Sequence, residues 1–499
     1  EKTGIRFVNE LSLSGEFDVF RYRNYYNGGG VAIGDINNDG RPDVFLTSNQ
    51  GDNRMFLNKG NFAFEDITVK AGVAGTRAWS TGVAMADVNG DGLLDIYVCN
   101  SGDVKGDDKE NELFINNGDL TFTEKAREYG LADKGFSTHA VFFDFDRDGD
   151  LDCYVLNNSF RPISTLNLRN LRPFRDEEGG DKLYENRNGR FIDISEKAGI
   201  YGSVIGFGLG VTVGDVNMDG WPDIYISNDF YERDYLYLNN KNGTFAEILT
   251  DAMPHTSNFS MGADMADINN DGLPDIFVTD MLPKDLQRIK QTTNFTTYDQ
   301  YQLTLRNGFH HQMMRNTLQL NNGNGTFSDI AQVLGVHATD WSWGALIADL
   351  DNNGHKDIFV SNGIYKDVTD QDYVNFLAND ENLAAAERGE KIDFKRFVDL
   401  MPSTKIHNYA FSNTGELRFE DRSKDWGFEM PTHSNGAAYG DLDGDGDLDL
   451  IINNVNEKLL VYDNRSHSMT GNKSLKIKLK GERSNTFALG AKVFVYTAG

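Results

Sequence analysis

One nine-residue pattern that recurs seven times along the chain constrains the fold more than any other feature of the sequence. Each copy reads Asp-x-Asx-x-Asx-Gly-x-x-Asp, where Asx is Asp or Asn. The copies occupy residues 35–43, 87–95, 144–152, 215–223, 267–275, 349–357 and 441–449. A repeat of this kind is typical of chains whose small units bury their apolar surfaces against each other. The 499-residue sequence is therefore predicted to form mainly one large repeat domain rather than a single small core.

The residues around each copy predict four short β-strands per repeat. An apolar run such as 30–34 precedes the nine-residue copy, and an alternating run such as 44–46 follows it. A further apolar segment then ends in Asn, as in 54–58, and a glycine-containing turn leads to a strand centred on Phe64 or its equivalent. Four strands are the content of one propeller blade. The predicted fold class is all-β, a seven-bladed β-propeller over residues 1–470.

The two ends of the chain complete this prediction. The seventh repeat lacks a fourth strand, and the segment 4–8 resembles the missing one, so we expect it to close the ring and to cover an otherwise open sheet edge. Residues 471–499 show a new alternation at 475–479 and 491–495. They are expected to be the truncated start of a second β-domain. The first residue is Glu1, so we expect the chain to begin after a processed or trimmed leader.

Oxygen-bearing side chains at alternate positions of each copy suggest a loop that binds Ca²⁺. A hard cation takes six to eight oxygen ligands, and glycine at the sixth position permits the tight turn around it. The seventh residue varies and is expected to offer its backbone carbonyl, whereas the ninth is always Asp and can complete the ligand shell. An EF-hand would need Glu at the twelfth position, where this sequence has Leu46, Val98 and other apolar strand residues. An Asx-rich turn without metal is the alternative reading of a single copy, but seven copies with one spacing favour calcium.

We therefore predict up to seven calcium sites, with the copy that carries Asn353 expected to be the weaker one. The predicted ligands are Asp35, Asn37, Asp39, Arg41, Asp43, Asp87, Asn89, Asp91, Leu93, Asp95, Asp144, Asp146, Asp148, Asp150, Asp152, Asp215, Asn217, Asp219, Trp221, Asp223, Asp267, Asn269, Asp271, Leu273, Asp275, Asp349, Asp351, Asn353, His355, Asp357, Asp441, Asp443, Asp445, Asp447 and Asp449.

Composition narrows the classes of partner and cofactor. The formal net charge is −28, and a chain this acidic repels phosphate backbones and anionic lipid, so nucleic acid is not an expected partner. The two cysteines, Cys99 and Cys153, lie in apolar strand-like runs and are expected to be buried free thiols, with a disulfide between them as the alternative. No apolar run reaches the ~18 residues that a membrane-spanning helix needs.

Strand order predicts which face of the propeller carries binding surfaces. If the metal loops join first and second strands, the second-to-third and fourth-to-first connections lie on the opposite face. Three long insertions, at about 159–180, 281–315 and 363–407, all fall in second-to-third connections and are expected to crown that face. The third insertion has an amphipathic helical pattern at Ile392, Phe394, Phe397, Val398, Leu400 and Met401.

The fourth-to-first loops should surround the central channel on the same face as the insertions. Their aromatic and polar side chains suggest a mouth that stacks a sugar ring or grips a peptide, although the same aromatics can instead fill the channel and pack between blades. The candidate ligand-binding residues are Tyr26, Trp79, His139, Phe207, Trp341, Trp343 and His433.

Sequence motifs favour a binding module over an enzyme. The sequence has no Gly-x-Ser-x-Gly elbow, His-Glu-x-x-His motif or phosphate-binding P-loop. Near the channel, His139 and His433 are the candidates for a general base. We expect a binding or scaffolding protein with a protein, glycan or peptide partner. A glycan-active hydrolase or lyase and an adhesion protein remain the alternatives.

The repeats resemble those of the FG-GAP/VCBS proteins, whose propeller is similar to that of integrin α-subunits. More narrowly, the segments 472–481 and 484–490 are similar to the opening of the ASPIC/UnbV domain of the cartilage acidic protein-like group. The sequences of segments 26–30, 228–230 and 340–343 resemble those of Bacteroidota surface proteins. This resemblance implies an extracellular or cell-surface location, outer-membrane lipoprotein anchoring and a role as an accessory to a SusC/SusD-type transporter.

Overall fold

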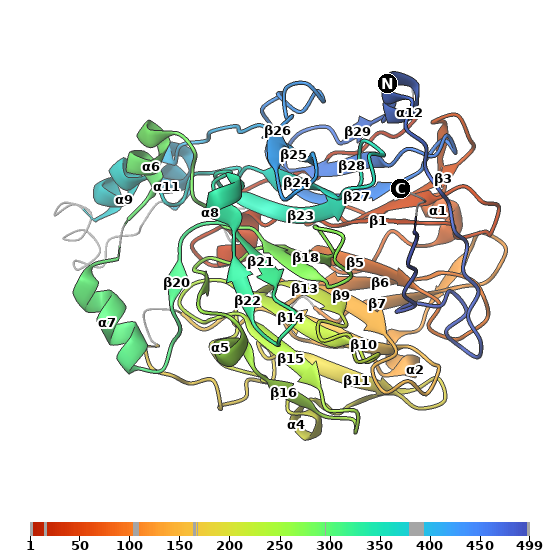
Figure 1. The fold of residues 1–499 in the computed structure, drawn as a ribbon, viewed down its shortest axis with the longest axis horizontal. Coiled ribbons are helices and arrows are strands. Elements are labelled where there is room, and N and C mark those ends of the chain that lie inside the picture. Colours follow the sequence, from red (N-terminus) through yellow and green to blue (C-terminus); the bar gives the residue numbers. More distant parts are fainter. Residues whose placement is uncertain are drawn as a thin grey trace.

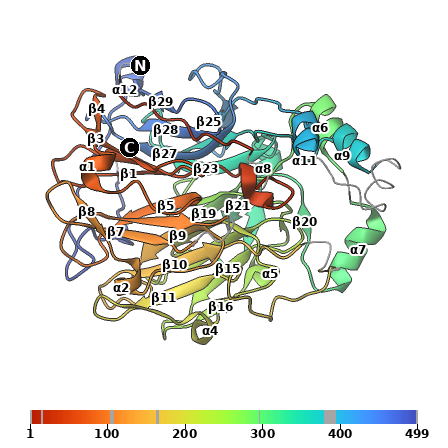
Figure 2. The same ribbon diagram turned by 180° about the vertical axis from the view of Figure 1, so that it is seen from behind.

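The computed structural model describes residues 3–13, 17–102, 109–162, 166, 168–294, 296–378 and 394–496. Six four-stranded sheets and one three-stranded sheet are arranged as the seven blades of a β-propeller (Figures 1 and 2). The first strands of successive blades contact one another around the ring, and the first strand of blade seven contacts that of blade one. The predicted fold class is therefore confirmed.

Each blade is an antiparallel meander whose strands follow one another in the sequence. The first strands, which line the centre of the ring, are β1 (Val31–Gly34), β5 (Ser80–Ala86), β9 (Ser137–Phe143), β13 (Gly208–Gly214), β18 (Ala263–Ala266), β23 (Ser342–Ala348) and β27 (Ser434–Gly440). The second strands are β2 (Asp43–Leu46), β6 (Asp95–Asn100), β10 (Asp152–Asn157), β14 (Asp223–Asn228), β19 (Asp275–Val278), β24 (Asp357–Asn362) and β28 (Asp449–Asn454).

The outer half of each blade is a hairpin. Its third strands are β3 (Arg54–Asn58), β7 (Glu112–Asn116), β11 (Lys182–Asn186), β15 (Tyr235–Asn239), β21 (Thr317–Asn321), β25 (Tyr409–Asn413) and β29 (Leu460–Tyr462). Its fourth strands are β4 (Phe64–Asp66), β8 (Phe122–Glu124), β12 (Phe191–Asp193), β16 (Phe245–Glu247), β22 (Phe327–Asp329) and β26 (Phe419–Asp421). One-turn helices follow most fourth strands: α1 (Thr68–Ala71), α2 (Ala126–Tyr129), α4 (Ser195–Ala198), α5 (Leu249–Ala252) and α8 (Ala331–Leu334).

The hydrophobic core lies between blades rather than within one of them. Val44, Phe45 and Leu46 of β2 are fully buried because both faces of a second strand pack against a neighbouring sheet. One cluster joins Phe45 of blade one to Ile96 of blade two, and similar clusters join other neighbours. Cys99 and Cys153 are buried free thiols in one of these clusters, as predicted.

The N-terminal segment closes the ring at blade seven. Val8 forms an antiparallel bridge with Lys458, and the Leu459 amide donates to the Phe7 carbonyl over 3.2 Å. The Phe7 side chain is buried against apolar residues of blades one and seven, including Leu459. The segment pairs with blade seven at the place where closure is predicted, through bridges rather than a continuous fourth strand.

The insertions lie on one face, which we call the insertion face, and the seven nine-residue loops lie on the opposite face, the loop face. Figure 1 shows the insertion helices at one end of the molecule, while the arrowhead of β23 points toward the other end. The second insertion contains α6 (Leu286–Thr292), α7 (Tyr298–Arg306) and β20 (Gln312–Met313), which pairs in parallel with β17 (Thr256–Ser257). The third contains α9 (Gln371–Leu377) and α11 (Phe394–Leu400).

Some predictions for the insertions lie outside the described residues. These are the parts of the insertions at 163–165, 167, 295 and 379–393, which include Ile392, and the side chain of Phe394. Val398 and Met401 are buried, in agreement with the amphipathic pattern, whereas Leu400 of the same predicted apolar set is 51% exposed. No helix among the described residues has the length and hydropathy of a membrane span.

The C-terminal segment differs from its prediction within the described range. After α12 (Ser466–Thr470), residues 472–496 contain no strand, although alternating runs at 475–479 and 491–495 predict two. Leu475, Ile477 and Leu479 are exposed, so the alternating apolar face has no sheet or core to pack against.

We expect Phe7→Ala to lower the free energy of unfolding by about 3 kcal/mol, because truncating a buried aromatic ring leaves a cavity. Val69→Ala serves as the control, since this side chain is 90% exposed. Chemical denaturation followed by intrinsic fluorescence measures both. Equal stability of the two variants would show that the N-terminal segment does not hold the ring closed.

Candidate metal loops and central channel

Glycine at the sixth position of each loop allows the backbone to curl around a common centre. Gly40, Gly149 and Gly446 have φ values of +87°, +96° and +96°, in the left-handed region that favours glycine. The curled backbone turns its amides inward: in the first loop the Gly40 amide donates to Asp35 Oδ2 over 2.7 Å, and the Asp39 amide donates to Asp35 Oδ1 over 3.0 Å. The first aspartate therefore organises the loop in which it lies.

The ninth aspartate connects each loop to the rest of its blade. In blade one, Asp43 Oδ2 accepts from the Ile36 amide of the loop over 3.0 Å, and Asp43 Oδ1 accepts from the Asn58 amide at the end of the third strand over 2.8 Å. The same pair of bonds recurs at Asp95, Asp152, Asp223, Asp275, Asp357 and Asp449. Each oxygen keeps a second lone pair that a cation can use.

The asparagine that ends the third strand links neighbouring blades. Asn116 Nδ2 donates to the Ile36 carbonyl of the preceding blade over 2.8 Å. Equivalent bonds to the preceding blade are made by Asn58, Asn239, Asn321, Asn413 and Asn464. In the third blade the corresponding amide of Asn186 donates to Leu151 of its own blade. The ninth aspartate, the loop and the adjacent blade thus form one hydrogen-bonded unit.

Carboxylates converge in the loops whose third residue is Asp. Oxygens of the first, third and ninth residues lie within 4.8 Å of one another in three loops. These triplets are Asp144, Asp146 and Asp152; Asp349, Asp351 and Asp357; and Asp441, Asp443 and Asp449. In the other four loops Asn replaces the third Asp, and its side-chain amide donates to the fifth residue, as Asn37 does to Asp39 over 3.1 Å.

The third loop is the clearest fit to a divalent cation. Asp144 Oδ1 and Asp150 Oδ1 are buried without a hydrogen-bond partner. Burial, together with neighbouring carboxylates, raises the pKa of Asp144 and Asp146, and it raises the pKa of Asp150 to about 7. Oxygens that lack a partner and repel one another are what a hard, oxygen-seeking cation would neutralise. The donor set therefore fits Ca²⁺, which would be held by the first, third and ninth carboxylates.

The side chains at the seventh position do not share one role. Arg41 pairs with Asp39, Trp221 lies under the Arg147 guanidinium, and His355 lies close to Asn270 of the neighbouring loop. This variety agrees with a position at which the Arg, Trp and His side chains are not metal ligands, whereas Asp150 of the third loop has a buried Oδ1 without a partner. That the backbone carbonyls of these residues bind calcium stays a prediction.

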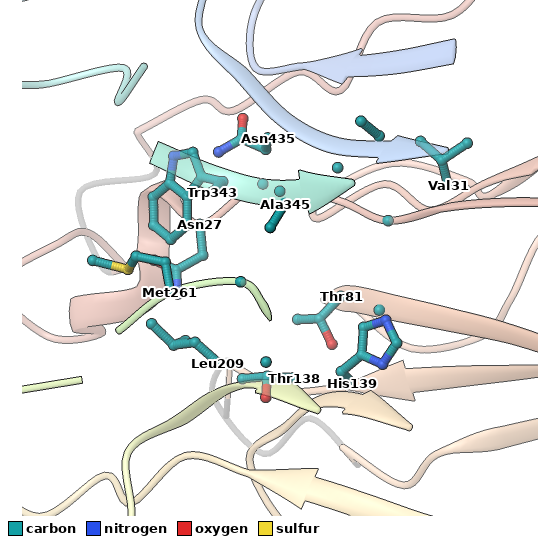
Figure 3. A pocket seen from close by; sticks show the side chains of 18 of the residues that line it. Asn27, Val31, Thr81, Thr138, His139, Leu209, Met261, Trp343, Ala345 and Asn435 are labelled. Carbon is teal, nitrogen blue, oxygen red and sulfur yellow. The ribbon is translucent and has the colours of Figure 1, made fainter. Parts of the chain in front are cut away.

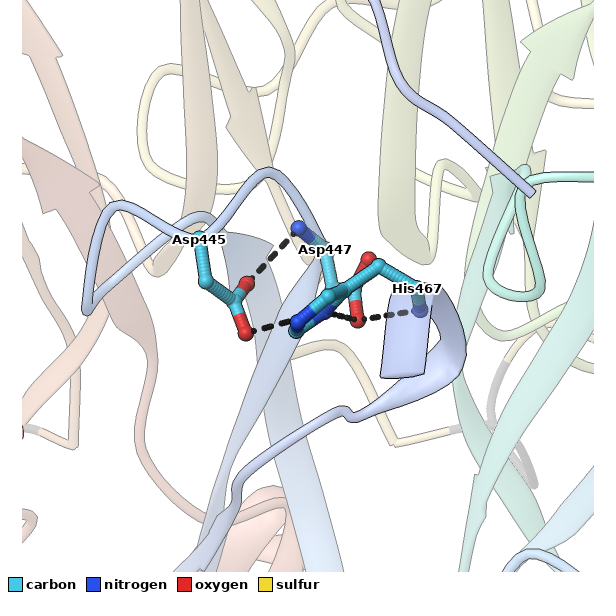
Figure 4. Close-up of side chains that lie close together, drawn as sticks. All are labelled: Asp445, Asp447 and His467. Carbon is cyan, nitrogen blue, oxygen red and sulfur yellow. Dashed lines mark hydrogen bonds and ion pairs between the residues drawn. The ribbon is translucent and has the colours of Figure 1, made fainter. Parts of the chain in front are cut away.

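His467 is a loop-face residue that sequence analysis missed. Its Nδ1 lies 2.8 Å from Asp447 Oδ2 and 3.2 Å from Asp445 Oδ2, so that a histidine from α12 reaches the seventh loop (Figure 4). The hydrogen bond to Asp447 raises the pKa of His467. His467 follows the last strand by several residues and belongs to no repeat, so no spacing in the sequence points to it.

The C-terminal segment runs across the loop face and contacts predicted metal ligands. The Lys492 ammonium contacts Asp215 Oδ2, and the Lys476 ammonium lies 3.2 Å from Asp441 Oδ2. The Thr486 hydroxyl contacts Asp87 Oδ2. All three aspartates are the first residues of their loops, so the segment and a bound cation would use the same oxygens.

A cavity of about 410 Å³ lies in the central channel (Figure 3). Of the candidate ligand residues, His139 and Trp343 line this cavity. Trp343 Nε1 donates to the Gly363 carbonyl over 2.7 Å, which fixes the indole in place. Burial lowers the pKa of His139, so its ring is neutral at physiological pH.

The other five candidate ligand residues do not line the cavity. Tyr26 and Trp79 are buried in an apolar cluster with Tyr22, Phe17 and Met261, against which Trp341 also packs. Because this cluster includes residues of η1 (Arg23–Tyr26) and of several fourth-to-first loops, it fills the insertion-face end of the channel instead of forming an open aromatic mouth.

Phe207 and His433 also serve in packing. Phe207 is fully buried beside Phe230, with the Arg23 guanidinium 4.7 Å from its ring centroid. His433 is 2% exposed and lies edge-on to Tyr365. Sequence analysis could not separate these packing aromatics from ligand-binding ones, because both occur in the same loops.

Two arginines of the first insertion make ion pairs. Arg172 pairs with the buried Glu232 over 2.6 Å, and Arg161 pairs with Asp176 over 2.7 Å.

Comparison with known proteins agrees with this architecture. A model of FG-GAP-like repeats matches residues 35–98, 101–155, 215–278 and 307–360. The chain therefore contains FG-GAP-like repeats that are arranged as a β-propeller. Cartilage acidic protein 1 of Mus musculus is 30% identical over 209 residues, which cover 41% of this chain and 29% of the mouse protein. The Xenopus tropicalis protein of that name is 32% identical over 209 residues, again 41% of this chain and 29% of the relative. The match thus spans less than a third of these relatives.

Two solved structures are similar to the chain at low sequence identity. An Agrocybe aegerita lectin that recognises non-reducing terminal N-acetylglucosamine aligns over 67% of this chain and 77% of its own, with a TM-score of 0.37 and 19% identity. The Vibrio cholerae biofilm matrix protein Bap1 aligns over 93% of this chain and 63% of its own, with a TM-score of 0.30 and 12% identity.

The raised pKa values of the ninth aspartates predict that the cation-free protein becomes less stable as pH rises. Burial is the main cause that raises their pKa, to about 7 for Asp43, Asp95, Asp223 and Asp449, about 6 for Asp275, about 8 for Asp357 and about 9 for Asp152. The unfolded value is near 3.9. Between these values the folded state binds more protons than the unfolded state, so its stability falls as pH rises.

We therefore expect the melting temperature in a chelator to fall as pH rises from about 5 to about 8, and calcium to remove most of this fall. Differential scanning fluorimetry at several pH values, with and without calcium, measures both. A melting temperature that is independent of pH in the chelator, or unchanged by calcium, would contradict the assignment of the loops.

We also expect Lys492→Met to raise the calcium affinity of the fourth loop, because the ammonium no longer competes for Asp215. The gain should be at most about fivefold, since a partly exposed ion pair contributes up to about 1 kcal/mol. Lys480→Met is the control, because Lys480 is an exposed lysine of the same segment. Calorimetric titration measures the affinity, and identical curves for both variants would show that the segment does not compete with the cation.

Proposed function

We propose that the chain is a calcium-stabilised binding module that acts outside the cell and engages a protein partner through the insertion face. The observation that carries this proposal is a set of exposed apolar side chains on the insertions. They are Phe160, Phe174, Leu286, Tyr298, Leu303, Met313, Val374 and Leu400. Exposed apolar side chains gathered on one face are typical of protein interaction sites.

The ring provides a rigid base for this surface. The nine-residue loops hold each blade on the loop face, while the insertion helices extend from the opposite face (Figure 2). Helices α6 and α9 come from different insertions and contact each other. A cavity of about 500 Å³ beside them is lined by Leu286, Lys290 and Asp372, among others. A surface assembled from several insertions on one scaffold suits recognition of a folded partner.

An enzymatic role has less support. His139 lines the channel, whereas His433 is buried elsewhere, so the two candidate bases do not share a site. A hydrolase needs an acid and a base that converge on one bond. Within the described residues, the groups of three acidic or histidine side chains whose ligand atoms lie within 4.8 Å of one another belong to three nine-residue loops and to the His467 cluster. We therefore favour a binder over a glycan-active hydrolase or lyase.

A finer proposal is that the chain is a surface lipoprotein that accompanies a SusC/SusD-type outer-membrane transporter. Its support is the sequence resemblance of 26–30, 228–230 and 340–343 to Bacteroidota surface proteins. An adhesion protein, the other alternative, would differ from this proposal only in its partner at the insertion face. Cross-linking on the source cell, followed by identification of the captured protein, separates a transporter from a matrix component.

We expect the double variant Leu286→Glu/Tyr298→Glu to lose capture of the partner by about tenfold or more, because two exposed anchors of a hydrophobic interface are made charged. Val69→Glu is the control, since Val69 is 90% exposed but lies on α1 outside the insertions. Quantitative cross-linking from the cell surface in calcium measures capture, and thermal melts confirm that all variants fold. Unchanged capture, or turnover of an oligosaccharide by the wild type, would overturn the proposal.

A further inference from the structure

Two residues of the central channel depart from the sevenfold repeat, and both line the same cavity. Five residues before the first aspartate of each loop, six blades have glycine and the third has His139. The glycines are Gly30, Gly82, Gly210, Gly262, Gly344 and Gly436. All seven residues line the cavity of about 410 Å³ (Figure 3). Every blade therefore contributes one residue to the cavity wall at this level, and of these seven residues only His139 has a side chain.

Close packing of the blades explains the glycines but does not require the histidine. A Cβ atom on Gly82 would lie 2.4 Å from the Thr138 carbonyl oxygen, and one on Gly262 would lie 2.2 Å from the Trp343 carbonyl oxygen. These distances leave no room for a side chain. Because six blades close without a side chain at this position, the imidazole of His139 is not needed to build the ring.

Asp264 departs from the repeat in the same way. Three residues before the first aspartate, the other six blades have uncharged residues, namely Ala32, Ala84, Val141, Thr212, Leu346 and Ala438. Asp264 is the only Asp, Glu, Lys or Arg among the described residues that line the cavity. A carboxylate in the channel is therefore a feature of this chain and not of the propeller repeat.

The carboxylate of Asp264 has hydrogen-bond donors but no counter-ion in the cavity. Its Oδ1 accepts from the Met265 amide over 2.8 Å, and its Oδ2 accepts from the Ile347 amide over 2.7 Å. Burial raises its pKa to about 6, so the group is mostly ionised near neutral pH. Charges removed from bulk water are normally paired with an opposite charge.

Two further polar atoms at the cavity have no hydrogen-bond partner. Asn435 Oδ1 and His139 Nδ1 are buried without a hydrogen-bond partner. Thr81 and Thr138 already donate their hydroxyls to backbone carbonyls of neighbouring strands. Apolar side chains such as Leu209, Met261 and Trp343 form part of the wall (Figure 3). The cavity thus combines one negative charge, unpartnered polar atoms and an apolar surface.

We propose that the central channel binds a small organic cation, whose ammonium group pairs with Asp264 while its remaining N–H or O–H groups donate to Asn435 and His139. A cavity of this size takes a small molecule rather than a macromolecule. The site is independent of a protein partner on the insertion face, because the aromatic cluster around Tyr22 and Trp79 fills that end of the channel.

The geometry points to a route into the cavity from the loop face. A second cavity, of about 890 Å³, shares Val211 and Thr212 with the first and continues to the C-terminal segment at 481–494. A small cation can follow this path past the acidic loops, whose negative charge attracts it.

Calorimetric titration of the calcium-loaded full chain tests the site with two matched pairs of probes, ethanolamine with ethylene glycol and glucosamine with glucose. Each pair differs by an ammonium in place of a hydroxyl. We expect the ammonium member of at least one pair to bind about thirtyfold tighter than its neutral partner, because it alone forms the charge pair. Equal affinities within both pairs, or no binding of any probe, would overturn the proposal.

Two substitutions replace an unusual residue by the one that other blades have at the same position, so both variants should fold. Asp264→Ala introduces the alanine that blades one, two and seven have at this position. His139→Gly introduces the glycine that the other six blades have. We expect Asp264→Ala to abolish the preference for ammonium and His139→Gly to weaken binding while keeping that preference. Glu128→Gln is the charge-matched control on the exposed surface of α2. A preference that survives Asp264→Ala, or is lost in Glu128→Gln, refutes the site without affecting the proposed function at the insertion face.

Discussion

The ninth aspartate of each loop makes the hydrogen bonds on which the rest of the propeller depends. One carboxylate oxygen accepts from the loop and the other from the end of the third strand, where an asparagine in turn reaches the neighbouring blade in six of seven cases. A carboxylate with two backbone donors is a strong local anchor. It is buried, however, and its charge has no neutralising partner within the loop. A calcium ion would supply that charge, so the blade contacts and a bound cation would be physically coupled.

This coupling explains why the two faces of the ring can serve different purposes. The loop face contains the repeated acidic loops and is covered in part by the C-terminal segment, whose lysines contact the first aspartates. The insertion face carries helices with exposed apolar residues such as Leu286 and Tyr298. Because the loops fix the blades from one side, the insertions on the other side can vary without disturbing the closed ring. The channel between the faces is a third environment, with His139 and Asp264 at positions that the repeat leaves uncharged.

Much of the fold was predictable because the repeat is both local and periodic. The nine-residue loops, the flanking strands and the closing role of the N-terminal segment follow from spacing and alternation alone. The ligand-binding residues were harder to predict, since Tyr26, Trp79 and Phe207 occur in the expected loops but are buried in packing clusters. Aromatic residues favour both a binding mouth and an apolar core. Burial decides between the two, and burial depends on residues that are distant in the sequence, such as Phe17 and Met261.

The sequence by itself determined the number of blades, the strand order, the acidic loops and the face on which the insertions lie. These features depend on short-range patterns that are repeated seven times, so each copy confirms the others. The tertiary structure alone decided that aromatic residues fill one end of the channel, that His467 and two lysines approach the loops, and that His139 and Asp264 line one cavity. The physical reason is ring closure: it brings together single residues from blades that are far apart in the chain, and no local pattern records those contacts.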